Sequence, residues 1–106
     1  MKFTDIVEKV RNIASGVDAT NRGFLAVQVN LTGKEGGVFY VEVKDGKINV
    51  EPYEYNDRNC AVTMSLTDFN KLIDGKLDPV LAFTMGKLKV DGDMGKALEF
   101  ANVLKK

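Results

Sequence analysis

The sequence predicts an α+β fold in which about four helices cover one face of a five-stranded, largely antiparallel sheet. Apolar residues near the start of the chain recur every three to four residues, which is the period of a helix packed on one side. Later segments alternate apolar and polar residues between short turns, as in an antiparallel meander with one wet face. The 106 residues suit one domain, so residues 1–106 are taken as a single unit.

The first predicted element is a helix from Phe3 to about Gly16. Its apolar stripe consists of Phe3, Ile6, Val7, Val10, Ile13, Ala14 and Val17. Charged and amide side chains fill the opposite side, and the polar run 18–23 follows the end of the helix. We therefore expect this helix to pack on the sheet by its stripe.

Two strands with one buried face are predicted next, at 25–32 and 39–44, with a turn at Gly33–Gly37 between them. The residues expected to face inward are Leu25, Val27, Val29, Leu31, Phe39, Val41 and Val43. The residues expected to face water are Ala26, Gln28, Asn30, Thr32, Tyr40, Glu42 and Lys44.

Asp45-Gly46 predicts a tight hairpin into a third strand, because glycine accepts a positive φ. Ile48 and Val50 lie in that strand, and Pro52 ends it because proline has no N–H to donate. The segment 51–59 is polar and is interpreted as a connection to a fourth strand at 60–64.

Two short helices should follow the fourth strand. Ser65 or Thr67 is placed to cap the first of them, and Gly75 to end it. Asp78-Pro79 begins the second, since aspartate is a favoured cap and proline suits the first helical position, and Gly86 ends it. Leu88 and Val90 then predict a brief fifth strand, and a last helix extends from Met94 to about Leu104.

The composition excludes several classes of function. Lys+Arg 15 balance Asp+Glu 15, which gives no cationic excess for a nucleic acid partner. The chain has no histidine and a single cysteine, Cys60, so neither a metal site nor a nucleophile with its base is apparent. We expect no cofactor, no metal and no enzymatic activity, and we interpret Cys60 as a small buried hydrophobe.

The chain shows neither a leader nor a membrane span by sequence. No apolar run approaches the ~18 residues that a spanning helix needs. An amphipathic pattern with Asp5 begins at once, unlike a signal peptide. We therefore expect a cytoplasmic location.

The C-terminal third carries more apolar residues than one packing face needs. The short helix beginning at Pro79 has no charge up to Lys87 and is apolar on every side, and the last helix has a similarly wide apolar stripe. From the pattern alone two interpretations remain. One is a dense core in a small domain, and the other is a hydrophobic ligand cavity between these helices and the sheet.

The same region resembles a known family. The residues that carry the resemblance are Ala61, Thr63, Met64, Ser65, Asp68-Phe69, Leu72, Gly75-Lys76-Leu77-Asp78-Pro79, Ala82-Phe83, Gly86-Lys87-Leu88-Lys89-Val90, Gly92-Asp93-Met94-Gly95 and Leu98. With this spacing the chain is similar to the sterol carrier protein type 2 family of non-specific lipid-transfer proteins. The resemblance implies a five-stranded sheet with helices on one side and a tunnel for sterols, acyl chains or acyl-CoA.

The resemblance also has departures. The chain ends in Val103-Leu104-Lys105-Lys106, without the Ser-Lys-Leu type of ending that directs eukaryotic members to peroxisomes. It also has little sequence beyond the last predicted helix. A compact, stand-alone form of this kind suggests a prokaryotic member, with a lipid rather than specifically a sterol as its ligand.

The predicted function is therefore the binding and transfer of a lipid, such as a fatty acid, acyl-CoA, phospholipid or sterol-like molecule, with transient membrane contact. The residues predicted to line the apolar tunnel are Leu77, Leu81, Phe83, Met85, Met94 and Leu98. Lys76, Lys87 and Lys89 flank this region, either to meet an anionic head group or simply as solvated residues. The alternative function is a protein-interaction module or homodimer of the same fold without a bound lipid.

Overall fold

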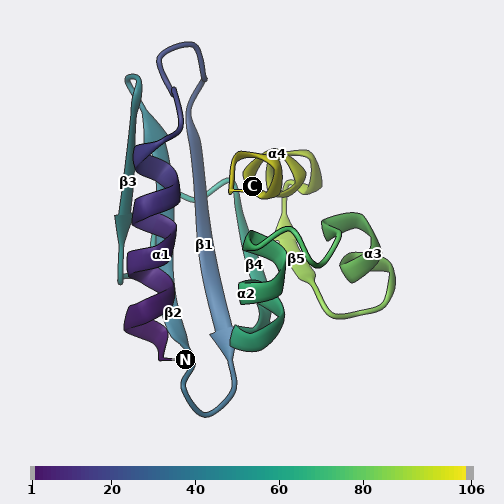
Figure 1. Ribbon diagram of the computed structural model, residues 1–106. Helices are drawn as coiled ribbons and strands as arrows, with labels where there is room; N and C mark the ends of the chain where they lie inside the picture. Colours follow the sequence, from purple (N-terminus) through teal and green to yellow (C-terminus); the bar gives the residue numbers. More distant parts are fainter. Residues whose placement is uncertain (1, 105–106) are drawn as a thin grey trace.

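The computed structural model describes residues 2–104. Its elements, in chain order, are α1 (Phe3–Ser15), β1 (Leu25–Thr32), β2 (Gly37–Lys44), β3 (Lys47–Glu51), β4 (Cys60–Ser65), α2 (Leu66–Ile73), α3 (Pro79–Thr84), β5 (Lys89–Gly92) and α4 (Met94–Leu104) (Figure 1). Lys105 and Lys106, which belong to the chain ending considered above, lie outside the described residues.

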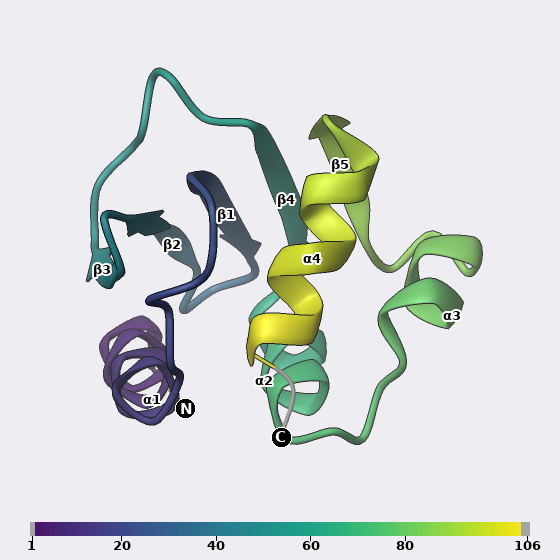
Figure 2. The same ribbon diagram turned by 90° about the horizontal axis from the view of Figure 1, so that it is seen from above.

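The five strands form one sheet in the order β3-β2-β1-β4-β5. Neighbouring strands are antiparallel except for β1 and β4, which are parallel. Helices α1, α2 and α4 lie on one face of the sheet, and α3 lies to the side, beyond the β5 edge (Figures 1 and 2). The predicted α+β fold, with a largely antiparallel sheet and helices on one side, is confirmed.

The core lies between the sheet and these three helices. The stripe of α1 buries Ile6, Val7, Val10 and Ala14 as its period predicts. Phe39 of β2 and Phe69 of α2 are fully buried, with ring centroids 5.7 Å apart in an edge-on arrangement. Such aromatic pairs add about 0.5–1.5 kcal/mol beyond the area that they bury, so this contact fixes α2 on the sheet.

The other face of the sheet is drier than the alternation predicts, which corrects one expectation. Ala26 and Gln28 of β1 were expected to face water, yet they are 0% and 8% exposed. The reason is the crossover from edge strand β3 to β4, whose residues 52–59 must pass over a face of the sheet. The helices occupy one face, so the connection passes over the other (Figure 2).

Polar contacts hold this connection against the sheet. The Tyr55 N–H donates to Gln28 Oε1 at 3.1 Å, and the Asn59 side-chain oxygen accepts from the Ala26 N–H at 2.7 Å. The Tyr55 hydroxyl donates to Glu42 Oε2 at 2.6 Å, which raises the pKa of Tyr55 to about 12 and lowers that of Glu42. Gln28 is therefore buried with its polar atoms paired, as a stable fold requires.

Local signals in the sequence set the turns and caps. Asp45 and Gly46 have φ of 52° and 76°, the left-handed backbone of a tight hairpin. Ser65, rather than Thr67, caps α2, because its hydroxyl accepts the Asp68 N–H at 3.0 Å. The fifth strand begins at Lys89, one residue after the predicted Leu88.

Candidate functional site

The short helix α3 is built by its first and last residues. The Asp78 carboxylate accepts the N–H groups of Val80 and Leu81 at 2.8 and 3.1 Å, and Pro79 follows in the first helical position. Gly86, with a φ of 78°, takes the left-handed conformation after the helix end. The predicted signals at the two ends therefore specify this six-residue helix, whatever the large apolar side chains between them contribute.

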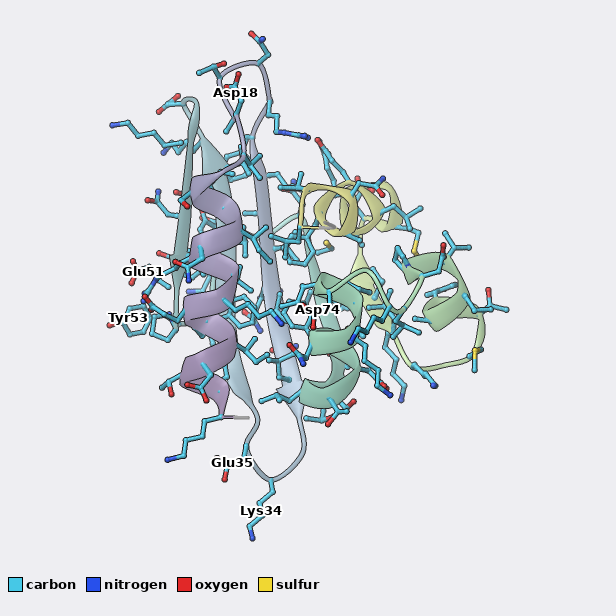
Figure 3. All side chains as sticks on the ribbon, viewed as in Figure 1. Asp18, Lys34, Glu35, Glu51, Tyr53 and Asp74 are labelled. Atoms are coloured by element: carbon cyan, nitrogen blue, oxygen red, sulfur yellow. The ribbon has the colours of Figure 1, made fainter. Side chains whose placement is uncertain are left out.

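One face of α3 anchors it to the rest of the fold. Pro79 and Ala82 are its buried residues, and Ala82 is 0% exposed. The Ala82 carbonyl accepts the N–H groups of Lys87 and Leu88 at 2.8 and 3.2 Å, so the chain doubles back beneath the helix. The remaining sides of α3 point away from the molecule (Figure 3).

Those remaining sides carry large apolar side chains. Val80, Leu81, Phe83 and Met85 are 57%, 53%, 42% and 56% exposed, and Met94 at the start of the neighbouring α4 is 38% exposed. We call these five residues the α3 patch. They make up five of the seven large hydrophobic residues that are exposed within residues 2–104. Each residue leaves about half of its ~200 Å² of surface open to water, so the exposed area of the patch is on the order of 500 Å².

The structure places the six predicted tunnel residues on or near this patch. Leu81, Phe83, Met85 and Met94 belong to it, while Leu77 and Leu98 are half-buried, and Leu77 packs against the core. An enclosed tunnel lined by these six residues stays a prediction, and in the structure four of the six side chains are exposed. Val80 was not among the predicted lining residues, although the absence of any polar side on the helix pointed to it.

The apolar excess of the last two helices has two different explanations. In α4 it is core: the buried residues are Ala97, Phe100, Ala101, Val103 and Leu104. In α3 the dense-core interpretation is wrong, because the side chains are not covered. At about 500 Å² the α3 patch has the size of the largest apolar patch on a typical monomeric protein, and such patches are often binding surfaces.

The α3 patch offers a ligand no polar contact of its own. The hydroxyl of Thr84, the one polar side chain of α3, donates to the Val80 carbonyl at 3.0 Å within the same helix. The flanking Lys76, Lys87 and Lys89 are exposed. The patch itself can therefore select for apolar surface, and any charge recognition must come from its borders.

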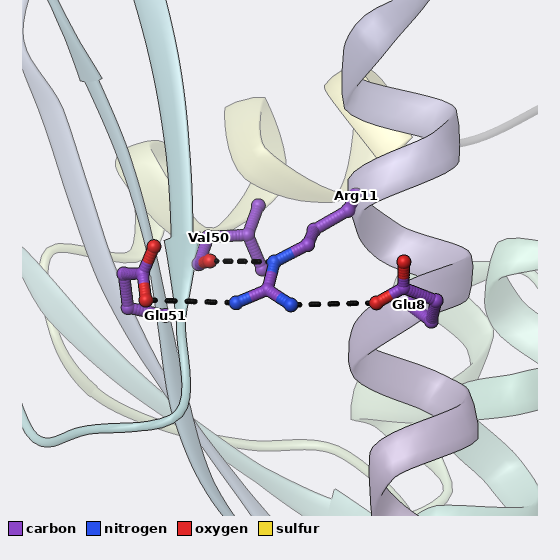
Figure 4. A network of polar contacts seen from close by, with 4 residues as sticks. All are labelled: Glu8, Arg11, Val50 and Glu51. Atoms are coloured by element: carbon purple, nitrogen blue, oxygen red, sulfur yellow. Dashed lines mark hydrogen bonds and ion pairs between the residues drawn. The ribbon is translucent and has the colours of Figure 1, made fainter.

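One open groove lies away from the six predicted tunnel residues. This groove of about 490 Å³ separates α1 from β3, with Arg11 on its wall. Arg11 Nε donates to the Val50 carbonyl at 3.0 Å, and its other nitrogens lie 3.3 and 3.5 Å from carboxylate oxygens of Glu8 and Glu51 (Figure 4). These contacts tie α1 to the edge strand and leave the guanidinium occupied.

Cys60 has the buried position that its strand pattern predicts. It is 1% exposed, and burial is the main factor that raises the pKa of its thiol to about 11. The thiol is therefore protonated at neutral pH and fills the core.

Within residues 2–104 no helix has both the length and the apolar content that crossing a bilayer requires.

The fold recurs in solved structures of sterol carrier domains. The structure of palmitated SCP2L2 from Aedes aegypti superposes with a TM-score of 0.76, covering 100% of this chain and 96% of that one at 22% sequence identity. At this identity the likeness concerns the fold. The chain therefore has the α+β fold of that sterol carrier domain.

The sequence itself identifies the family. The pattern of the SCP-2 sterol transfer family matches residues 17–105, and this chain belongs to that family. It is 42% identical to human Sterol carrier protein 2 over 71 residues, and 38% identical to Hydroxysteroid dehydrogenase-like protein 2 of Xenopus tropicalis over 78 residues. The resemblance predicted from the residues between Ala61 and Leu98 is confirmed.

The relatives are much longer than the matched region. The match covers 67% of this chain but 13% of the human protein, and 73% of this chain but 19% of the Xenopus protein. The family is named for sterol transfer, which supports lipid binding and transfer as the class of function. The activities of the longer proteins do not follow from the shared domain.

Proposed function

We propose that this chain binds a lipid through the α3 patch and carries it between membranes without chemical change. The observation that carries the proposal is that α3 and its C-cap residue Met85 together expose four large apolar side chains to water. Exposed apolar groups add no stability to the folded state, so the folded domain alone does not account for them. An apolar ligand that covers them does.

The energetics suit a carrier. A sixteen-carbon chain gains on the order of 13 kcal/mol on leaving water, at about 0.8 kcal/mol for each methylene. Relative to a bilayer interior that gain nearly vanishes, so loading and unloading are both feasible. Met85 and Met94 add a surface that adapts to different chains, because methionine is unbranched and polarizable.

The ligand class is a molecule with a long apolar part, such as a fatty acid, acyl-CoA, phospholipid or sterol-like molecule. We propose that the half-buried Leu77 and Leu98 also contact the bound chain, on the side of the ligand that faces the core. The palmitated state of the SCP2L2 domain is in line with an acyl chain as ligand. We place the exchange in the cytoplasm, with transient membrane contact through the same patch.

The alternative is that the patch binds protein, including a second copy of this chain. Its area of on the order of 500 Å² is less than the ~800 Å² that each partner contributes to a standard interface. Sedimentation separates the two functions. A mass that rises with protein concentration while no lipid binds would favour the protein-interaction module.

The direct test of lipid binding uses freshly purified protein. Native mass spectrometry and organic extraction should reveal a co-purified lipid, and the delipidated protein should bind a fluorescent fatty acid. Addition of oleate should displace the fluorescent probe. Protein that carries no lipid and binds no fatty acid or acyl-CoA would contradict the proposal.

A further inference from the structure

A small groove lies next to the α3 patch, where β4 ends and β5 begins. It encloses about 260 Å³ and is lined by Thr32, Thr63, Met64, Ser65, Asp68, Gly86, Lys87 and Lys89. Thr63 and Lys89 are paired across the antiparallel strands β4 and β5, so their side chains leave the sheet on the same face. Gly86 and Lys87 directly follow the C-cap residue Met85 of the patch, which makes the groove continuous with the patch along the chain.

The groove presents hydrogen-bond donors that have no acceptor. The Thr63 hydroxyl accepts from the Asn30 side chain at 3.2 Å and the Ser65 hydroxyl accepts from the Asp68 N–H at 3.0 Å. In the described part of the chain neither hydroxyl donates a hydrogen bond, so both protons are available to a ligand. A group with several acceptor oxygens would satisfy them together.

The charges of the groove also favour an anion. Lys87 and Lys89 are exposed, and neither forms an ion pair with a described residue. Asp68 is the one acidic residue of the lining and opposes them. By contrast, the helix starts at the other borders of the patch carry Asp78 and Asp93, which repel an anion. The groove is therefore the cationic border of an apolar surface.

We propose that this groove binds the anionic head group, a phosphate or a carboxylate, of the lipid whose chain lies on the α3 patch. The proposal rests on the proposed function and narrows it: a lipid with an anionic head group should bind more tightly than a neutral lipid of the same chain length. Lys87 and Lys89 supply the charge, and the hydroxyls of Thr63 and Ser65 donate to the head-group oxygens.

The test compares three probes by calorimetry: dodecyl phosphate, dodecanol and inorganic phosphate, each below the concentration at which it aggregates. The variant is Lys87→Gln with Lys89→Gln. The matched control is Lys47→Gln in β3, an exposed lysine on the opposite edge of the sheet. All three lysines are exposed, so thermal melting should show folded proteins of similar stability.

We expect the double variant to bind dodecyl phosphate about tenfold more weakly, because each exposed charge contributes up to ~1 kcal/mol. Dodecanol should bind as before, and Lys47→Gln should change neither affinity. Asp68→Asn should strengthen dodecyl phosphate binding. Added salt should weaken the binding of dodecyl phosphate but not that of dodecanol, since exposed charges are screened within about 8 Å at physiological ionic strength.

The outcomes separate the two proposals. Equal binding of both lipids, unaffected by the double substitution, would overturn the head-group site while leaving lipid binding intact. Inorganic phosphate that binds as tightly as dodecyl phosphate would show that the groove serves free phosphate and not a head group. Failure of the unmodified protein to bind either lipid would overturn the proposed function and, with it, the head-group site.

Discussion

Phe83→Ala gives the sharpest separation between ligand binding and folding. Phe83 lies in the α3 patch and is 42% exposed, while Phe24, just before β1, is 43% exposed. Both substitutions remove the same side chain at nearly the same exposure. Phe24→Ala is therefore a matched control for everything except membership of the patch.

The exposed part of Phe83 sets the size of the effect. At 42% exposure the residue leaves roughly 90 Å² open to a ligand. At about 25 cal/mol per Å², complete coverage of that area by a lipid contributes about 2 kcal/mol, or roughly thirtyfold in Kd. Coverage of half the area gives roughly fivefold. We expect Phe83→Ala to weaken oleate binding within this range.

The assay is displacement of a fluorescent fatty acid by oleate, with urea unfolding measured in parallel. Both variants should lose a similar part of their free energy of unfolding, about 1–2 kcal/mol, because each ring is slightly more than half buried. Only Phe83→Ala should lose affinity. Oleate binding to Phe83→Ala as tight as to the unmodified protein, or an equal loss of affinity in Phe24→Ala, would show that Phe83 does not contact the ligand.

Three further predictions concern the scaffold. Ser65→Ala removes the hydroxyl that caps α2 and should lower the free energy of unfolding by about 1 kcal/mol, measured in urea; no change would show that the cap is dispensable. Gly92→Ala should lower the free energy of unfolding by more than about 2 kcal/mol, because the φ of residue 92 is 109° and the new Cβ would lie 2.7 Å from the Asn59 carbonyl oxygen. A melting temperature equal to that of the unmodified protein would contradict this. Tyr55→Phe should raise the pKa of Glu42 toward its ordinary value, as followed by NMR titration of the carboxyl group. The lowered pKa of Glu42 means that its ionised carboxylate stabilises the folded protein at pH values above the unfolded-state pKa. This contribution is lost as the pH falls through the folded-state pKa. The free energy of unfolding of Tyr55→Phe should therefore depend less on pH in the acid range.

Much of the fold follows from short-range signals in the sequence. The period of α1, the Asp45-Gly46 hairpin and the Asp78-Pro79 start of α3 each act within a few residues, so a single sequence is enough to predict them. The five strands could be placed for the same reason. These signals fix where the elements begin and end but not which strands are neighbours.

Long-range pairing explains the part that the alternation pattern missed. The parallel pairing of β1 with β4 sends residues 52–59 over the second face of the sheet and buries Gln28. A glutamine that alternates with valines in a strand is predicted to face water. The partner that allows Gln28 to be buried, the Tyr55 N–H, lies 27 residues away in the sequence. Nothing local to the strand indicates that contact.

The sequence predicted most of the residues of the candidate site but not that their side chains are exposed. A helix without a polar side is compatible with a buried helix, a tunnel wall and an open surface, and the sequence does not distinguish the three. The structure shows Leu81 of α3 and the C-cap residue Met85 more than half exposed, while Ala82 is fully buried. Because α3 is anchored through Pro79 and Ala82, its larger side chains stay outside. This arrangement depends on how α3 packs beside the β5 edge.

The most direct measurement of the central claim is intermolecular NMR contact between bound oleate and the methyl groups of the protein. If the lipid lies on the α3 patch, cross-peaks should connect the acyl chain to Leu81, Met85 and Met94, with none to the groove between α1 and β3. Cross-peaks confined to that groove, for example to Ala14 and Ile48, would contradict lipid binding on the α3 patch.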